Sequence, residues 1–240
     1  MDLMNSFKYT LIKKIRLYNL VIAVFVQEQC LHLLSDVEGT STKVKFMGLV
    51  GSKGAATVRF DFAGVSVCCV NSHLTAHQFN VKSRVNDYNL ITSIQQFKDK
   101  SAKNIMEHDY IFWMGDLNFR LDKISTEVAL DHVKKQEFQT LLKYDQLTKL
   151  RTLKTAFNGF KEAPINFRPT YKFDPKTDNY DIKSQRKPAW TDRIIWKLSK
   201  EDSFLKVKAG SYQSHPYLKQ SDHRPVTGYF FFKAFKNDRF

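Results

Sequence analysis

Apolar, largely β-branched runs are concentrated toward the two ends of this chain, and most of its helix-forming residues lie between them. Seven runs have the length and composition of strands, at 15–26, 43–50, 55–62, 65–70, 194–198, 205–212 and 224–233. An eighth run, 110–114, lies among segments 28–37, 81–99 and 125–156, which have helical patterns. Strands followed by helices and then by more strands predict a layered α/β sandwich around a mostly antiparallel sheet.

Nothing in the sequence divides the chain into separate domains. Its 240 residues suit one domain of ordinary to large size, and no repeat or Pro/Gly/Ser-rich linker interrupts it. The apolar run Leu17–Val26 is too short to span a bilayer. The polar segment 157–189 holds four of the six prolines and predicts a long ordered loop, a feature that is often functional.

Charge and cysteine content narrow the function classes. Lysine and arginine number 38 against 24 acidic residues, so the formal charge is +14. Such an excess suits an anionic partner: a nucleic acid, an acidic membrane leaflet or a polyphosphate, and composition leaves all three open. The three cysteines are too few for a disulfide scaffold and have no metal-binding spacing, which favours a reducing compartment.

Polar clusters follow two of the predicted strands. The segment 71–77 (NSHLTAH) places His73 just beyond a strand, where an imidazole could donate a proton or a hydrogen bond to an anionic oxygen. In 112–120 (FWMGDLNFR), Asp116 and Asn118 are two residues apart and would share a face of extended chain. Asp can orient a water and Asn can hold a phosphate oxygen. Capping of a turn by His, and Gly-Asp-Asn turn geometry, are the purely structural alternatives.

Two more clusters precede the strands near the C-terminus. Asp192 and Arg193 open one strand, where Asp could orient a histidine and Arg could neutralise phosphate. Asp222 and His223 precede another and are candidates for metal binding and acid–base chemistry. The structural alternatives are a weak surface Asp–Arg pair and a turn.

A fifth cluster is basic and lies in loops, with Lys53 between glycines and with the pair Tyr171 and Lys172. Exposed lysines on ordinary hairpins would look the same. Taken together, the clusters hold His, Asp, Asn, Lys and Arg at strand ends, without a nucleophile elbow for Ser or Cys. That combination suits metal-assisted hydrolysis of a phosphate ester by water.

At these residues the sequence resembles the inositol polyphosphate 5-phosphatases, in a superfamily that also includes metal-dependent nucleases and sphingomyelinases. The matching motifs are FWMGDLNFR (112–120), RKPAWTDRII (186–195), NSHLTAH (71–77), the segment 48–54, PTYKFD (169–174) and SDHRPV (221–226). The resemblance covers about 15–235. PAWTDR and PTYK distinguish the phosphatases from their nuclease relatives.

The resemblance implies catalytic roles for matching residues. Asp116 corresponds to the residue that orients the attacking water, and Asn118 to the amide that holds the scissile phosphate. His223 corresponds to the catalytic histidine with Asp192 as its orienting carboxylate, and His73 to a second histidine on the phosphate.

The resemblance also implies substrate and metal contacts. The implied substrate contacts are Lys53 at the 1-phosphate, Tyr171, Lys172 and Arg186 at the 4-phosphate, and Arg193 and His77. Ser52 replaces the Asn that is common beside this Lys. Asp222 is the candidate ligand for Mg²⁺, the implied cofactor.

The family's fold is a four-layer α-β-β-α sandwich of the deoxyribonuclease type. Residues 1–240 would then form one catalytic domain, incomplete at the N-terminus, because the chain enters the pattern at a strand over 20–26. The two preceding strands, one with the family's metal-binding Glu, have no counterpart. Gln27-Glu28 mimics that motif, but it lies too close to 48–54, and we interpret it as an ordinary strand-to-helix junction.

The leading functional hypothesis is an Mg²⁺-dependent phosphatase that removes the 5-phosphate of phosphoinositides or soluble inositol polyphosphates, in the cytoplasm and peripherally at anionic membranes. Catalytically impaired binding of phosphoinositides is the alternative, because the metal Glu has no counterpart. A metal-dependent nuclease is a third hypothesis; PAWTDR and PTYK argue against it, and no nucleic-acid partner is expected.

Overall fold

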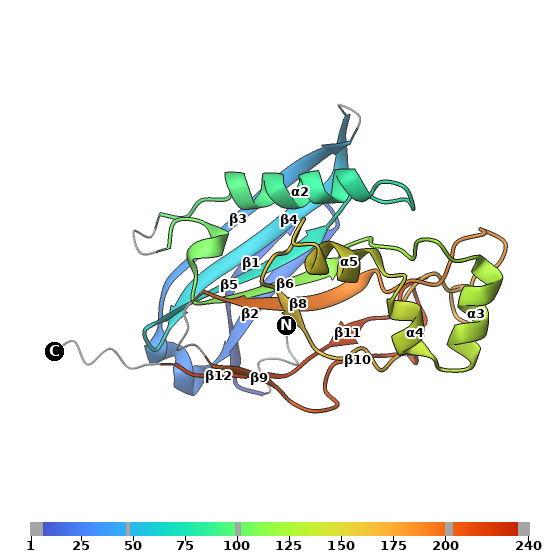
Figure 1. Cartoon of the computed structure of the whole chain (residues 1–240). Coiled ribbons are helices and arrows are strands. Elements are labelled where there is room, and N and C mark those ends of the chain that lie inside the picture. The colour runs from blue at the N-terminus through green and yellow to red at the C-terminus, as the bar shows by residue number, and fades with distance from the viewer. Residues whose placement is uncertain (1–6, 47–48, 99–101, 200–203, 235–240) are drawn as a thin grey trace.

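A six-stranded mixed sheet forms the centre of the structure, a computed structural model that describes residues 7–46, 49–98, 102–199 and 204–234 (Figure 1). The strand order is β3-β4-β5-β6-β8-β7. The strands are β3 (Leu34–Phe46), β4 (Leu49–Phe62), β5 (Val65–His73), β6 (Tyr110–Asp116), β8 (Asp192–Leu198) and the short β7 (Lys161–Glu162). Only the β5–β6 pair is parallel, so the prediction of a mostly antiparallel sheet is confirmed.

The parallel pair forms because β5 and β6 are joined by a long crossover that contains α2 (Val81–Ile94) and the 3₁₀ turn η2 (Ile105–Glu107). Both strands are buried over most of their length, which explains their almost continuous apolar sequences. As a result, β5 and β6 end at the same edge of the sheet, with His73 opposite Asp116.

Helix α2 lies over one face of the central sheet, and small sheets cover the other (Figure 1). On β6, Trp113 packs into the core beneath α2, together with Tyr88 and Phe157. The neighbouring Phe112 points the other way, into a cluster with Phe230 and Trp196. This alternation gives the sheet two apolar faces and buries both.

Three two-stranded sheets make up the second β layer, on the face opposite α2. They are β1 (Tyr9–Leu17) with β2 (Leu20–Gln27), β9 (Leu205–Val207) with β12 (Phe230–Phe232), and β10 (Gln213–Ser214) with β11 (Val226–Thr227). The β1–β2 hairpin packs on β3, β4 and β5 through residues such as Ile15 and Ile22. The α/β fold class with two stacked β layers is confirmed.

Several predicted elements differ in detail. The single strand expected over 15–26 is a hairpin that turns at Tyr18, whose φ is 54°. The helix expected over 28–37 is the 3₁₀ helix η1 (Glu28–Leu33), after which β3 begins. The strand expected over 205–212 is limited to residues 205–207, and the one expected over 224–233 is broken into two short strands at 226–227 and 230–232. Polar residues in the first half of β3 weaken the strand pattern, so that half was not predicted. Met47 and Gly48, which belong to the strand expected over 43–50, lie outside the described residues.

The helical segment over 125–156 is three helices: α3 (Thr126–Lys134), α4 (Phe138–Leu142) and α5 (Gln146–Thr152). Ser125 and Asp145 cap α3 and α5 by accepting hydrogen bonds from backbone N–H groups of the first turn. Residues 157–189 form the predicted ordered loop, apart from β7. None of the helices in the described ranges has the length and apolar character to cross a bilayer.

Candidate active site

Three of the predicted catalytic residues come from one row across the central sheet. Asp116 ends β6 and is the register partner of His73 on β5 and of Asp192 on β8. Directly opposed residues on neighbouring strands put their side chains on the same face of a sheet. The strand ends therefore bring together residues that are as far apart in sequence as 73 and 192.

Asp116 is held by hydrogen bonds on both oxygens. Oδ1 accepts from the backbone N–H of Asn118 at 3.0 Å, and Oδ2 accepts from Asn118 Nδ2 and pairs with His73 Nε2, both at 3.0 Å. Burial opposes ionisation of this carboxyl, but the His73 hydrogen bond and the nearby charge of His223 outweigh it and lower the pKa of Asp116. Asp116 is thus an oriented anion at neutral pH.

Asn118 meets Asp116 for a different reason from the one expected. The strand ends at Asp116, and Asn118 adopts a left-handed backbone with φ 56°, so the shared face of an extended segment does not apply. Its side chain folds back instead. Nδ2 donates to Asp116 and to the backbone oxygen of Leu74 at 3.0 Å, and Oδ1 accepts from Arg120. In this arrangement the amide of Asn118 orients Asp116.

His223 and Asp192 form a dyad across the cavity. His223 Nδ1 lies 2.9 Å from Asp192 Oδ2, which also accepts from the hydroxyls of Thr170 and Thr191 at 2.8 and 2.9 Å. Burial disfavours the imidazolium, but the contact with Asp192 outweighs it and raises the pKa of His223. Because Nδ1 faces Asp192, Nε2 is the nitrogen left to act on a ligand. The ring of Tyr171 supports His223 with a centroid separation of 4.6 Å.

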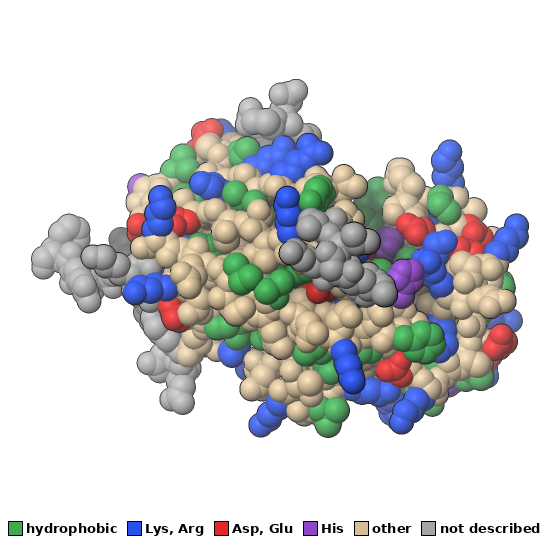
Figure 2. All heavy atoms as spheres, turned by 90° about the horizontal axis from the view of Figure 1, so that it is seen from above, with side chains coloured by type: hydrophobic (Ala, Val, Ile, Leu, Met, Phe, Trp, Pro, Cys, Tyr) green, Lys and Arg blue, Asp and Glu red, His purple; other side chains and the backbone are tan. Residues whose placement is uncertain are grey.

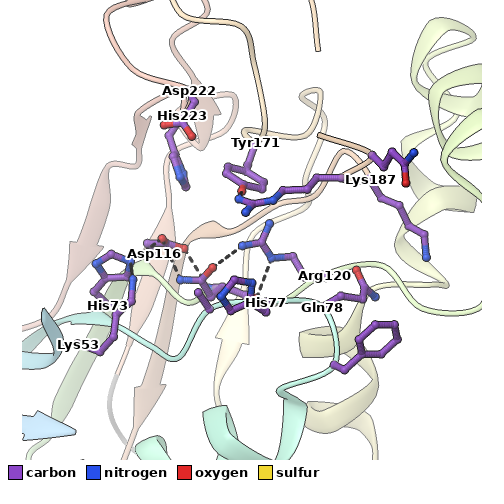
Figure 3. Close-up of a pocket in the computed structure, with 15 residues that line it drawn as sticks. Lys53, His73, His77, Gln78, Asp116, Arg120, Tyr171, Lys187, Asp222 and His223 are labelled. Atoms are coloured by element: carbon purple, nitrogen blue, oxygen red, sulfur yellow. Dashed lines mark hydrogen bonds and ion pairs between the residues drawn. The ribbon is translucent and has the colours of Figure 1, made fainter. Parts of the chain in front are cut away.

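Asp116 and His223 both line a cavity of about 610 Å³ (Figure 3). Nine of the predicted site residues line it: Lys53, His73, His77, Asp116, Asn118, Tyr171, Arg186, Asp222 and His223. Arg120 and Lys187 add further positive charge, so the lining is predominantly cationic. Lys53 contacts Nε2 of His73, and burial lowers the pKa of its ammonium group. The cavity therefore suits an anionic ligand.

The loop over His77 is fixed from behind by α2. Arg84 is buried and donates to the backbone oxygens of Thr75 and His77 at 3.0 and 2.8 Å. Asp87 accepts from the backbone N–H of Thr75 at 2.8 Å. These contacts hold His77 in a left-handed conformation with φ 75° on the cavity wall.

Lys172 and Arg193 lie outside the cavity lining. The ammonium group of Lys172 pairs with Asp181 on the same loop. Arg193 is fully buried behind the site and is bonded to Glu162 at 2.6 and 2.7 Å and to Asp145 at 3.1 Å. Nε, Nη1 and Nη2 all donate to carboxylates of the protein, so the structure corrects its predicted contact with substrate to a structural ion-pair network.

The site can supply few hard ligands to a metal ion. Asp116, Asp192 and His223 each bring one ligand atom to within 4.8 Å of the others, and Asp222 lines the same cavity without belonging to this group. Mg²⁺ commonly uses one or two carboxylates and completes its shell with water and phosphate oxygens, so these residues fit such an ion. Glu28 lines a separate cavity with Phe7 and Lys8, which agrees with its interpretation as a structural residue.

Some site residues were not singled out from the sequence. Arg120 ends the motif 112–120, two residues after Asn118, and its charge within that motif was the available signal, but its contact with Asn118 depends on the folded loop. Thr170 and Thr191 flank other predicted residues and carried no signal, because their role is to bind the buried oxygen of Asp192. Phe79, which lines the cavity and is 94% exposed, was also not predicted as a site residue.

Comparison with known proteins supports the reading of these motifs. The family model described as endonuclease/exonuclease/phosphatase family 2 matches residues 1–229. Phosphatidylinositol 4,5-bisphosphate 5-phosphatase A of Mus musculus is 35% identical over 250 residues, which cover 99% of this chain and 25% of that protein. The type II inositol 1,4,5-trisphosphate 5-phosphatase of Mus musculus is 39% identical over 228 residues, which cover 93% of this chain and 22% of that protein. The chain thus spans about a quarter of the length of these curated relatives.

A solved structure agrees with the sequence relatives. The inositol polyphosphate 5-phosphatase domain of SPsynaptojanin, solved in complex with inositol (1,4)-bisphosphate and calcium ion, superposes with a TM-score of 0.83 and 36% identity. The match covers 94% of this chain and 64% of that one. The resemblance inferred from the motifs is confirmed, and the chain belongs to the endonuclease/exonuclease/phosphatase family.

Proposed function

We propose that this site hydrolyses the 5-phosphate of phosphoinositides, such as phosphatidylinositol 4,5-bisphosphate and 3,4,5-trisphosphate, and of soluble inositol polyphosphates. The observation that carries the proposal is that Asp116 and His223, whose Nδ1 is held by Asp192, line a common cationic cavity. The names of the similar proteins, which act on a phosphoinositide and on inositol 1,4,5-trisphosphate, support this substrate class. Because the relatives are much longer, the activity is assigned to this site and not to a whole protein.

The proposed reaction is attack of water on the phosphorus. Asp116 is anionic and fixed by Asn118 and His73, so it can orient the water and accept its proton. As the bond from phosphorus to the inositol 5-oxygen breaks, the imidazolium of His223, held by Asp192, would donate its proton from Nε2 to that leaving oxygen, so that an inositol hydroxyl and inorganic phosphate are released.

A divalent cation is part of the proposal, with Mg²⁺ as the expected ion. Asp116 and Asp222 present carboxylates to the cavity, and a carboxylate oxygen of Asp192 lies within 4.8 Å of one of Asp116. When bound there, the ion would neutralise phosphate charge and lower the pKa of the attacking water. The calcium ion in the solved relative's description supports a divalent metal in this fold.

Recognition of the remaining phosphates is assigned to the walls of the cavity. Lys53 would contact the 1-phosphate, and Tyr171 with Arg186 the 4-phosphate. Arg186 already donates to the hydroxyl of Tyr171, so the two form one donor group on the loop 169–189. Lys172 is paired with Asp181 outside the lining and would have to turn toward the cavity to join them. His77 lines the wall between these two ends.

The setting proposed for the reaction is the cytoplasmic surface of an anionic membrane. The formal charge of +14 supports peripheral binding to acidic lipids. Figure 2 shows lysine and arginine side chains spread over the visible face, with histidines beside a hollow at one end. The same charge would serve soluble inositol polyphosphates by steering them to the cavity.

Phosphate release tests the proposal directly. The chain is incubated with inositol 1,4,5-trisphosphate, with vesicles that contain phosphatidylinositol 4,5-bisphosphate, and with linear DNA, each with Mg²⁺ or with EDTA. We expect Mg²⁺-dependent release from both inositol substrates and no cleavage of DNA. Asp116→Asn should abolish release, while Asp131→Asn, a surface change on α3, should not. DNA cleavage without phosphate release would instead favour a nuclease.

The second candidate function is binding without turnover. It is motivated by the small set of carboxylate ligands around Asp116 in a cavity that is otherwise cationic. In that case the chain would bind inositol 1,4,5-trisphosphate with and without Mg²⁺ and release no phosphate. Calorimetric titration on the same samples distinguishes this outcome from a chain that neither binds nor hydrolyses.

A further inference from the structure

Arg120 connects the two walls of the cavity. Arg120 is 7% exposed, and its guanidinium group points toward Tyr171 (Figure 3). Nε donates to the backbone oxygen of Asn118 at 3.2 Å, and Nη2 donates to Oδ1 of the same residue. The guanidinium carbon lies 4.2 Å from the centroid of the Tyr171 ring.

The contact with Oδ1 determines which way the amide of Asn118 points. A carboxamide has one acceptor and one donor end of nearly the same shape, so only its partners select the orientation. Here both hydrogens of Nδ2 are used, toward Asp116 Oδ2 and toward the oxygen of Leu74, each at 3.0 Å. Arg120 occupies the acceptor end, and the amide is therefore fully satisfied in one orientation.

The opposite orientation would be unfavourable for Asp116. A rotated amide would place its oxygen against the carboxylate, and it would also leave Arg120 facing an N–H group. Without Arg120 one of these two penalties disappears, and the amide oxygen gains nothing by staying where it is. The amide would then be held by its two donor contacts alone, and the hydrogen bond by which it fixes Asp116 would be less rigid.

The other side of Arg120 fixes the second wall. Tyr171 stacks against the ring of His223, and a cation over an aromatic ring within about 6 Å is attracted to it. The single guanidinium thus contacts the residue that orients Asp116 and the residue that supports His223. Arg120 therefore links these two residues directly, through a hydrogen bond to Asn118 and a cation–π contact with Tyr171.

We propose that Arg120 is a positioning residue that sets the orientation of the Asn118 amide, and through it of Asp116, relative to the wall that carries Tyr171 and His223. The proposal rests on the proposed function, because it concerns the geometry of the same site. It requires the forked guanidinium and not positive charge alone. Lysine has a compact ammonium group that cannot donate along one edge while stacking its plane on a ring.

The first experiment compares Arg120→Lys with Arg151→Lys. Arg151 is also partly buried and also donates to a backbone oxygen and to a carboxylate, Phe160 O and Glu162, but it lies outside the cavity. We expect Arg120→Lys to lower kcat roughly a hundredfold, as a misplaced reactive group does, and to change KM less than threefold because the charge is retained. Arg151→Lys should change neither.

The second experiment is a double-mutant cycle with Asn118→Ala. If Arg120 acts through Asn118, Arg120→Lys should cause less than a threefold further loss of kcat once the amide is gone. A further loss as large as in the wild-type background would overturn the proposal. An equal fall of kcat in Arg151→Lys would overturn it as well, because the effect would then be a general response to lost buried arginines.

A readout without turnover separates this proposal from the proposed function. Selective ¹⁵N labelling of asparagine, with Asn118→Ala to assign the signal, reports hydrogen exchange at Nδ2. We expect slow exchange in the wild type and in Arg151→Lys, and at least tenfold faster exchange in Arg120→Lys. An inactive wild type with this pattern would contradict the proposed function alone. Unchanged exchange in Arg120→Lys would overturn the positioning role whatever the activity.

Discussion

Asp116 on β6 lies directly opposite Asp192 on β8, so two carboxylates that serve different partners start from one cross-strand pair. Asp116 binds Asn118 and His73, while Asp192 binds His223. The register that opposes them is held by the core, where Trp113 faces Ile195 and both are fully buried. A slip by one residue would turn each of these side chains to the opposite face, so the packing of the sheet also fixes the site.

The dyad makes a prediction about additivity. If Asp192 acts only by orienting His223, the two act as a unit and their losses should not multiply. We expect Asp192→Asn with His223→Ala to have the same kcat as His223→Ala alone, within a factor of about three. Phosphate release from inositol 1,4,5-trisphosphate measures this. Fully multiplicative losses would remove Asp192 from the role of an orienting carboxylate.

The pairing of Lys172 with Asp181 predicts competition with substrate. A 4-phosphate that binds Lys172 would compete with Asp181 for its ammonium group. Asp181→Asn should therefore lower KM for substrates with a 4-phosphate by roughly threefold, since a paired surface charge contributes modestly. Lys172→Met should raise KM for the same substrates.

The control for this prediction is a substrate that lacks the 4-phosphate, whose KM should be the same in the wild type and both variants. Equal changes on both substrates would mean that Lys172 acts through the loop and not through the phosphate. Asp131→Asn, which breaks an exposed pair with Lys135 on α3, serves as the matched variant.

The same pair predicts an acid-sensitive loop. Hydrogen bonds from Lys172 and from the backbone N–H of Ser184 lower the pKa of Asp181 to about 2, below the ordinary value of 3.8. A lowered carboxyl pKa stabilises the folded loop above about pH 4, and this contribution is lost as the pH falls toward 2. Hydrogen exchange of peptides from 172–187, corrected for intrinsic rates, should rise over that range in the wild type. Asp181→Asn should show no such rise.

The ion pairs of Arg193 predict a loss of stability. Arg193→Met leaves the carboxylates of Asp145 and Glu162 without their buried partner, and breaking such a pair costs about 3–5 kcal/mol. Urea unfolding followed by tryptophan fluorescence measures the free energy of unfolding. Arg186→Met, on the cavity wall, should change it by less than about 1 kcal/mol and should raise KM instead. The reverse pattern would restore Arg193 as a substrate contact.

The sequence predicted the site better than the strands that carry it. Apolar runs such as 65–70 and 110–114 end where polar residues begin, so convergence at the sheet edge followed from alternation and strand ends. The first half of β3 was missed because Ser35, Asp36 and Gly39 weaken its pattern, and its pairing with β4 decides its conformation. Tyr18 gave no turn signal because a non-glycine residue with positive φ is held there by the hairpin.

Arg193 shows that the sequence does not determine which partner a single side chain will have. An arginine beside a catalytic aspartate is compatible with phosphate binding and with an ion pair, and the two differ only in the face of β8 that it occupies. Its carboxylate partners come from 145 and 162, which sequence spacing does not connect to 193. Asn118 was placed correctly beside Asp116, but its left-handed backbone and its contact with Arg120 depend on the loop around it.

The last prediction concerns the metal. Asp116 and Asp222 line the cavity, and Glu28 lies in a different cavity beside Lys8. Because Mg²⁺ binds through oxygen ligands that it touches, carboxylates at the cavity should affect its binding far more than a carboxylate in another cavity. We expect Asp222→Asn to raise the Mg²⁺ concentration for half-maximal phosphate release about tenfold, as loss of a supporting carboxylate does. Glu28→Gln should leave that concentration unchanged. Mn²⁺ binding without substrate, followed by electron paramagnetic resonance, should likewise be weakened by Asp222→Asn and not by Glu28→Gln. If Glu28→Gln weakened Mn²⁺ binding as much as Asp222→Asn, Glu28 would be a ligand after all, and the loop that follows β2 would have to move to the cavity for the ion to bind.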